Sequence, residues 1–492
     1  MAETPATWFR GASIEVVTDS GGRIVAAGPG AGDAAPRSIR VVELRGELLP
    51  GLHDAHLHLD GLVGSKLGVE LEGCSTRGEA LARVAAHARG LGAGDWLIGR
   101  GWYNDAWGDD PGFPDRTLLD GVAGGRPAVL WRKDGHSAWV STAALRAAGV
   151  VRGGPDPKGG VIDRDARGEP TGILRESAMD LVGRILPEPA AAEVDRAMTE
   201  VLHDLARLGL TSVTSMDPIA DFGVLQRLHR RSPLPIRVNY NVPVAELEAA
   251  VRMGVHSGLG DARLRIWGVK AFLDGSLGSR TAAMLDGTGV SLYTVAELEE
   301  LGRRCADARL NVCWHAIGDA AVRNALDALE PMAGAWDGWR PRIEHAQCVR
   351  AEDRPRFRSA AVIASMQPIH AVTDRELADR EWPGLTADAY AWSALEAAGA
   401  VLAFGSDAPV ETADPLPGLA AATTWRQQAA WHTELALTRE SALRAYTAGA
   451  AYAVGMEAEL GSIGPGYRCD LTVVEGDRVT ATVVDGEVVW QA

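Results

Sequence analysis

Eight short segments with the composition of β-strands alternate with helical segments through most of this 492-residue chain. Between them, apolar residues recur every three or four positions, as in 194–208, which is typical of amphipathic helices. Alternation of this kind favours a parallel sheet, either closed or doubly wound. Eight is also the number of strands in a (β/α)8 TIM barrel, the α/β fold that we predict. The strand candidates are 48–58, 209–217, 235–242, 264–274, 311–319, 341–347, 362–368 and 401–407.

The two ends of the chain have a different pattern. Residues 8–50 contain short alternating segments separated by glycine-rich turns, including 13–17, and residues 459–491 repeat this style. Asp485-Gly486 stands between two apolar runs, as in a β-hairpin turn. We expect residues 1–50 plus 459–492 to form one small β domain, and residues 51–458 to form the barrel.

One connection is far too long for the barrel. Residues 61–205 separate the first two strand candidates, whereas such loops usually contain two to six residues. We therefore predict an inserted subdomain that leaves the first strand at the catalytic end of the barrel, covers the barrel mouth and returns to begin the second strand. Its tryptophans would either form an apolar wall over the site or simply make the core of the insert; they are Trp102, Trp107, Trp131 and Trp139.

Composition excludes several classes of partner. The net charge is -16 and no run is rich in lysine or arginine, which argues against nucleic acid. No apolar run is long enough for a membrane span, and no apolar leader opens the chain, so we expect a cytoplasmic protein without membrane contact. The five cysteines are scattered and form no CxxC pair, which is typical of buried free thiols.

The strongest sign of chemistry is a pair of histidines at the end of the first strand candidate. His56 and His58 are two positions apart, so both side chains leave the same face of a strand and can bind one cation. Further candidates fall near the ends of later strands: Lys270 on the fourth, His315 on the fifth, His345 on the sixth and Asp407 on the eighth. Barrel active sites are built at these carboxyl ends.

Imidazole and carboxylate donors predict one or two divalent metal ions per chain. Zinc is the element we expect, although manganese, iron and nickel accept the same donors. A lysine ammonium cannot bind a metal. Carbamylation by carbon dioxide would make Lys270 an anion that bridges two metals; the alternative is a structural lysine paired with an acid such as Asp274.

The motifs that surround these residues resemble the amidohydrolase superfamily. They are PGLHDAHLH, VKAFLDGSLGSRTA, HAIGDAA, IEHAQ, ASMQPIH and FGSDAPVE, supported by DGHSAWVS and LTRESALRAYTAGAAYA. The nearest branch is the YtcJ-like group, which includes N-substituted formamide deformylases. The resemblance implies a barrel with a β-sandwich built from both ends of the chain. It also implies metal ligands at His56, His58, His315, His345 and Asp407, with Lys270 as the carbamylated bridge.

The function that follows is hydrolysis of a C–N bond in an N-acyl, N-formyl or cyclic amide. A metal lowers the pKa of bound water from about 15.7 toward 7 and polarises a carbonyl. Asp407 is the expected proton carrier, and Asp407 and Lys270 are the expected catalytic residues. Candidate substrate contacts are the polar residues near the strand ends and on the insert: Asp134, His136, Asp274, Arg280, Asp319, Gln367 and His370.

Two other functions remain open. A metal-dependent deaminase on the same barrel would act on a C=N centre, and a single-metal deaminase would not need the bridging lysine. A non-catalytic barrel would be marked by lost ligands, and none is lost here. The substrate is a small molecule, and the oligomeric state stays open, with a homodimer as one candidate.

Overall fold

Eight parallel strands form the central barrel of the computed structural model, which describes residues 6–12, 14–35, 39–92 and 94–492. All eight predicted strands are present, so the predicted barrel fold is confirmed. Residues 48 and 49 of the first candidate belong instead to a strand of the terminal sheets. Around the barrel the strands are β6 (Leu52–Leu57), β13 (Leu210–Ser215), β14 (Arg237–Pro243), β15 (Leu264–Phe272), β16 (Asn311–Ala316), β17 (Arg342–His345), β18 (Ile363–Met366) and β19 (Val401–Phe404).

Helices follow the barrel strands, and their apolar faces pack against the sheet in one continuous core. A capping box of Thr294 and Glu297 begins α9, and Gly209 follows the end of α6 with φ +90°. The barrel helices are α1 (Leu59–Leu67), α6 (Ala191–Arg207), α7 (Ile219–Arg231), α8 (Leu247–Arg252), α9 (Val295–Asp307), α10 (Asp319–Leu329), α11 (Arg354–Ser359), α12 (His370–Glu381), α13 (Trp392–Ala397), α14 (Pro415–Ala420), α15 (Arg426–Ala429), α16 (Arg439–Tyr446) and α17 (Ala448–Ala453).

The barrel closes where the first strand meets the last. The Asp407 amide donates to the His56 carbonyl at 2.7 Å, and the His58 amide donates to the Ala408 carbonyl at 2.7 Å. The buried Asp54 carboxylate reinforces this seam by accepting from the Ser406 hydroxyl at 2.5 Å. The seam places the end of β6 beside the residues that follow β19.

Both ends of the chain build two four-stranded sheets that share one apolar core. One sheet contains β1 (Thr7–Arg10), β2 (Glu15–Thr18), β3 (Ile24–Gly28) and β4 (Arg40–Glu43); the other contains β5 (Glu47–Pro50), β20 (Leu471–Glu475), β21 (Arg478–Val484) and β22 (Glu487–Gln491). Asp485 and Gly486 form the predicted turn, both with positive φ. Residue 13, the first of the predicted strand 13–17, lies outside the described residues. Residues 1–5 and 36–38 of the predicted domain 1–50 lie outside them as well.

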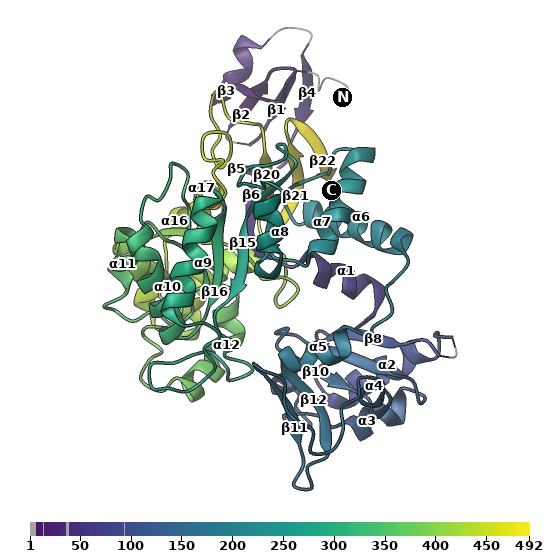
Figure 1. Cartoon of the computed structure of the whole chain (residues 1–492). Helices are drawn as coiled ribbons and strands as arrows, with labels where there is room; N and C mark the ends of the chain where they lie inside the picture. Colours follow the sequence, from purple (N-terminus) through teal and green to yellow (C-terminus); the bar gives the residue numbers. More distant parts are fainter. Residues whose placement is uncertain (1–5, 13, 36–38, 93) are drawn as a thin grey trace.

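The segment between β6 and β13 carries a separate lobe, which Figure 1 shows below the barrel and away from the terminal sheets. Its six-stranded sheet has the order β11-β12-β10-β9-β8-β7. Helix α6, which falls in the predicted insert 61–205, packs in the barrel core instead, because its apolar stripe includes Met198 and Leu202. The strands of the lobe are β7 (Val69–Glu70), β8 (Leu97–Trp102), β9 (Ala128–Arg132), β10 (Ser137–Val140), β11 (Gly160–Arg164) and β12 (Pro170–Glu176), with helices α2 (Arg77–Ala88), α3 (Arg116–Val122), α4 (Thr142–Ala147) and α5 (Asp180–Gly183).

The tryptophans of this lobe divide between its core and the barrel mouth. Trp102, Trp107 and Trp139 are buried in the apolar core of the lobe itself, so they form no wall over the site. Trp131 does line the central cavity.

Among the helices of the described residues, none is long and apolar enough to cross a membrane.

Candidate metal centre

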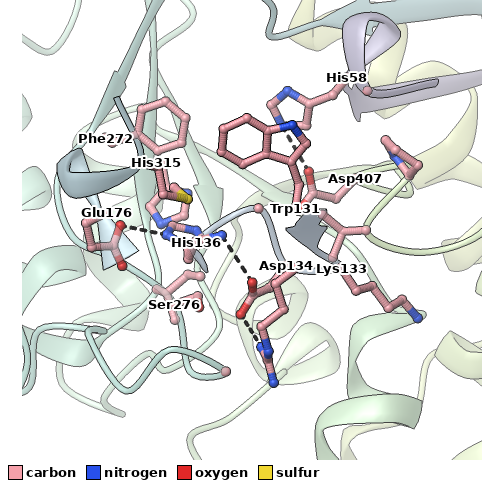
Figure 2. Close-up of a pocket in the computed structure, with 18 of the residues that line it drawn as sticks. His58, Trp131, Lys133, Asp134, His136, Glu176, Phe272, Ser276, His315 and Asp407 are labelled. Carbon is pink, nitrogen blue, oxygen red and sulfur yellow. Dashed lines mark hydrogen bonds and ion pairs between the residues drawn. The ribbon is translucent and has the colours of Figure 1, made fainter. Parts of the chain in front are cut away.

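The first cluster of ligand atoms lies at the seam where the barrel closes. The Asp407 Oδ1 atom is 3.4 Å from Nε2 of His56 and 3.2 Å from Nε2 of His58. Figure 2 shows the His58 ring and the Asp407 carboxylate facing each other in the lining of the cavity. These three residues form one of the groups in the described chain whose ligand atoms all lie within 4.8 Å of one another.

Two buried carboxylates orient these histidines from behind. Glu344 Oε2 lies 2.7 Å from His56 Nδ1, and Asp217 Oδ1 lies 3.4 Å from His58 Nδ1. A carboxylate only accepts hydrogen bonds, so the Nδ1 atom of His56 carries the proton and its Nε2 atom faces Asp407. The longer contact between His58 and Asp217 is an ion-pair distance. The sequence analysis missed both acids. For Glu344 a signal existed, because Arg342 and Glu344 are two charged residues on one face of an otherwise apolar strand.

The electrostatics of the cluster favour a positive charge between the three ligands. Burial and the nearby Lys270 lower the pKa of His56 to about 4, so its ring is neutral. Burial alone would lower the pKa of His58, but Asp217 and Asp407 raise it to about 10. The pKa of Asp407 stays well below its ordinary value, because His56 and His58 outweigh the effect of burial.

Lys270 lies on the inner face of β15, next to this cluster. Its Nζ atom is 3.3 Å from His56 Nε2, and only 3% of the residue is exposed. It forms no ion pair with Asp274 among the described residues, so the alternative pairing is not present. Burial lowers the pKa of Lys270, and Glu344 and Asp407 only partly oppose this. A lowered pKa increases the neutral amine, which is the form that reacts with carbon dioxide.

A second group of ligand atoms consists of His345, His370 and the same Asp407. Asp407 Oδ2 is 3.9 Å from Nδ1 of His345 and 3.7 Å from Nε2 of His370. The predicted ligand His315 is not in this group; its ring centroid lies 4.5 Å from that of His345. Nε2 of His315 is instead 3.1 Å from the Gly275 carbonyl oxygen, so Nδ1 is the ring nitrogen left to bind a metal. The geometry therefore adds His370, predicted as a substrate contact, to the possible ligands.

The residues at the first cluster fit a bound cation. Asp407 Oδ1 is buried and accepts no hydrogen bond from a described residue. In the second group, His370 Nε2 is likewise buried without a hydrogen-bond partner among the described residues. Buried polar atoms normally have a partner. Imidazole nitrogens and a carboxylate that converge without one are the donor set of a divalent transition metal. The backbone is also strained here: His345 has φ 71° and Asp407 has φ 60°, a conformation that non-glycine residues keep mainly at functional sites.

The cavity above these ligands has a volume of about 660 Å³ and is lined by both the barrel and the inserted lobe. His136 of the lobe reaches the site, with its ring centroid 5.6 Å from that of His315. Its Nδ1 atom lies 2.9 Å from Glu176 Oε2, and its backbone amide donates to Asp134 Oδ1 at 3.1 Å (Figure 2). Glu176 is a further residue that the sequence analysis missed. The arrangement holds an imidazole from the lobe over the barrel site.

Four of the predicted substrate contacts have other partners. Arg280 lies outside the cavity lining, with 63% of its side chain exposed and Glu381 at 3.3 Å. Asp319 accepts a hydrogen bond from the Leu285 amide at 2.8 Å. Gln367 accepts one from His345 Nδ1 at 2.8 Å and is not part of the cavity lining. Asp274 does line the cavity, but three backbone amides occupy its carboxylate: those of Ala283, Ile317 and Gly318. Direct contact with a substrate is therefore not supported for Arg280, Asp319 or Gln367.

The chain is similar to proteins of one family in both sequence and structure. A family model described as "Amidohydrolase family" matches residues 40–490. The Bacillus subtilis (strain 168) protein named "Putative amidohydrolase YtcJ" is 31% identical over 485 residues, which cover 92% of this chain and 90% of that protein. The N-substituted formamide deformylase of Arthrobacter pascens is 27% identical and covers 96% and 91%. The crystal structure of an uncharacterized metal-dependent hydrolase from Pyrococcus furiosus has a TM-score of 0.72 at 28% identity, with coverages of 94% and 95%.

Proposed function

The chain belongs to the amidohydrolase family, and from this premise we propose that it hydrolyses the C–N bond of an N-acyl, N-formyl or cyclic amide. The observation that carries the proposal is the convergence of His56, His58 and Asp407 at the barrel seam, with Lys270 beside them. Because one relative is named an N-substituted formamide deformylase, N-formyl amines are the first substrates to test.

We propose that one or two divalent ions would be held by His56, His58, carbamylated Lys270, His315, His345 and Asp407. His370 is an additional candidate, because it shares a group of ligand atoms with His345 and Asp407. Zinc is the element we propose. When bound, such an ion lowers the pKa of a coordinated water and polarises the substrate carbonyl. Glu344 and Asp217, on the Nδ1 side of His56 and His58, would leave the Nε2 atoms of both rings available to such an ion.

Asp407 moves the proton. Its carboxylate lies between the histidine groups and on the cavity wall, so it can take a proton from the attacking water and deliver it to the leaving nitrogen. General acid–base transfer of this kind typically contributes about 10² to 10⁴-fold in rate. This carboxylate is ionised at neutral pH, because its pKa is held well below its ordinary value.

Lys270 would supply an anionic ligand after reaction with carbon dioxide. The neutral amine would form an N–C bond to carbon dioxide and release one proton, which leaves a carbamate whose single negative charge is shared by two oxygens. This change removes the positive charge next to His56 and replaces it with a ligand. The buried position of Lys270 supports the step, because burial lowers the pKa of its amine.

The test begins with metal analysis of the purified protein and a screen for hydrolysis. We expect one to two transition-metal ions per chain and hydrolysis within a set of N-formyl, N-acyl and cyclic amides, but not release of ammonia from purine or pyrimidine amines. Asp407→Asn should reduce kcat by about 10² to 10⁴-fold. Turnover of the amines alone would favour a deaminase, and protein that neither retains nor takes up metal would refute the proposal.

A further inference from the structure

Four cationic side chains line the central cavity of the described chain, and three of them have an evident counter-charge or are in solvent. The Arg132 guanidinium is paired with Asp105 at 2.5 Å and with Asp134. The Lys133 ammonium lies 2.8 Å from Glu411. Lys158 is exposed at the rim. The fourth cation, Arg100 on β8, is different.

Arg100 makes no side-chain hydrogen bond and no ion pair with any described residue, and its Nε atom is buried without a partner. Burial lowers the pKa of this arginine; Glu70 and Asp60 oppose the shift, yet neither lies within ion-pair distance. A guanidinium offers five N–H donors and remains charged in proteins. Keeping it partly out of water without a counter-ion is costly, so the site favours an incoming anion.

The position of Arg100 places that anion near the metal centre. A Cβ atom built on Gly61 would lie only 2.3 Å from Arg100 Nη1 and 2.8 Å from Pro409 Cδ. Gly61 is in the first turn of α1, which begins directly after His58, and Pro409 is two residues after Asp407. The guanidinium therefore lies beside the His58 and Asp407 side of the cavity. Only a glycine at position 61 leaves it this space.

We propose that Arg100 binds a carboxylate of the substrate, so that the preferred substrates are N-acylated or N-formylated amino acids and not neutral amides. This inference rests on the proposed function and names its substrate class. A planar guanidinium binds a carboxylate through two parallel hydrogen bonds. The cavity also contains acidic side chains, among them Asp60, Glu176 and Glu411, so a singly charged anion fits it better than a dianionic phosphate.

Binding without turnover tests the proposal on the metal-loaded full-length protein. The probes are N-methanesulfonyl derivatives of ω-amino acids with two to five carbons, which amide hydrolysis does not cleave, and the N-methanesulfonyl alkylamines of equal length. Calorimetry gives the ratio of the Kd of each neutral probe to the Kd of its acidic partner. At its best chain length we expect this ratio to be about 10 to 100 in the parent protein, since hydrogen bonds to charged groups contribute that much.

Two variants and one control assign the preference to Arg100. Arg100→Met should reduce the ratio to near one. Gly61→Ala should reduce it as well, because the added methyl displaces the guanidinium, and it keeps the test informative if Arg100→Met does not fold. The matched control is Arg280→Met, which removes an arginine outside the cavity and should keep the parent ratio.

The proposal is overturned if the parent protein prefers no acidic probe, or if the preference survives in both folded variants, as it would for a carboxylate bound only to the metals. Equal loss in Arg280→Met also overturns it, because a general charge effect would then be responsible. Failure of the proposed function is a separate result: an Arg100-dependent preference in a protein that cleaves none of the N-formyl, N-acyl and cyclic amides would refute amide hydrolysis and keep the binding site.

Discussion

Replacing Glu344 with glutamine tests whether a fully buried carboxylate behind the site controls both the metal ligands and the fold. Glu344 accepts from His56 Nδ1 at 2.7 Å and pairs with the Arg342 guanidinium at 2.8 Å. Glutamine has nearly the same shape and can still accept one hydrogen bond. The substitution therefore removes the charge and leaves most of the packing.

The structure gives the expected magnitude of the loss. Burial alone would raise the pKa of Glu344, but Arg342 and His56 lower it from 4.5 to about 2. At 1.36 kcal/mol per pKa unit, this corresponds to roughly 3 kcal/mol in favour of the charged form. Removing one partner of a buried ion pair typically costs about 3 to 5 kcal/mol, which agrees in size. Loss of a carboxylate behind a ligating histidine reduces metal affinity by about 10- to 100-fold.

Two measurements check this prediction. Urea unfolding of the metal-free protein should show Glu344→Gln to be less stable by roughly 3 kcal/mol. Competition with a zinc chelator should show a Kd for metal that is higher by about 10- to 100-fold. The control is Glu411→Gln, which removes another buried cavity carboxylate that pairs with Lys133 and contacts no candidate ligand. A metal Kd in Glu344→Gln that matches that of Glu411→Gln would refute the proposed orientation of His56.

Three further outcomes follow from the structure. Lys270→Ala should lose at least one metal ion and most activity, with partial recovery on adding acetate or propionate; unchanged metal content would identify Lys270 as structural. His136→Ala should lower kcat/KM without changing metal content, because His136 contacts Glu176 and the cavity but none of the paired ligand atoms; unaltered kinetics on a cleaved amide would exclude this role. Asp485→Asn should destabilise the protein by about 2 kcal/mol at pH 7, because burial is outweighed by Arg237 and Arg263, which lower the pKa of Asp485 from 3.8 to about 2. A carboxyl with a lowered pKa stabilises above its unfolded value, so the difference between parent and variant should shrink as the pH falls from 3.8 toward 2, and a difference independent of pH would contradict the charge argument.

The elements of the barrel could be predicted because their signals are local. Each strand candidate carries its own β-branched residues, and each ends near a polar residue that the parallel order brings to one edge. The prediction was weaker for residues whose partner is remote in sequence. His315 lies within β16 (Asn311–Ala316), whereas Asp319 lies beyond its end and Arg280 lies in the loop after β15 (Leu264–Phe272). The loops turn these two side chains to the Leu285 amide and to Glu381. No period or motif encodes that choice.

The sequence by itself determined the barrel, the terminal β domain, the long insertion and the residue types at the strand ends, because spacing and composition decide these over a few neighbouring positions. Only the tertiary structure decided which of those residues meet. Closure of the barrel joins Asp54 to Ser406 across 352 positions and so puts Asp407 against His56 and His58. It also decided that Glu344 stands behind His56 and that Arg100 faces the cavity without a counter-ion. These contacts depend on the distances between distant segments after folding, which a linear pattern does not contain.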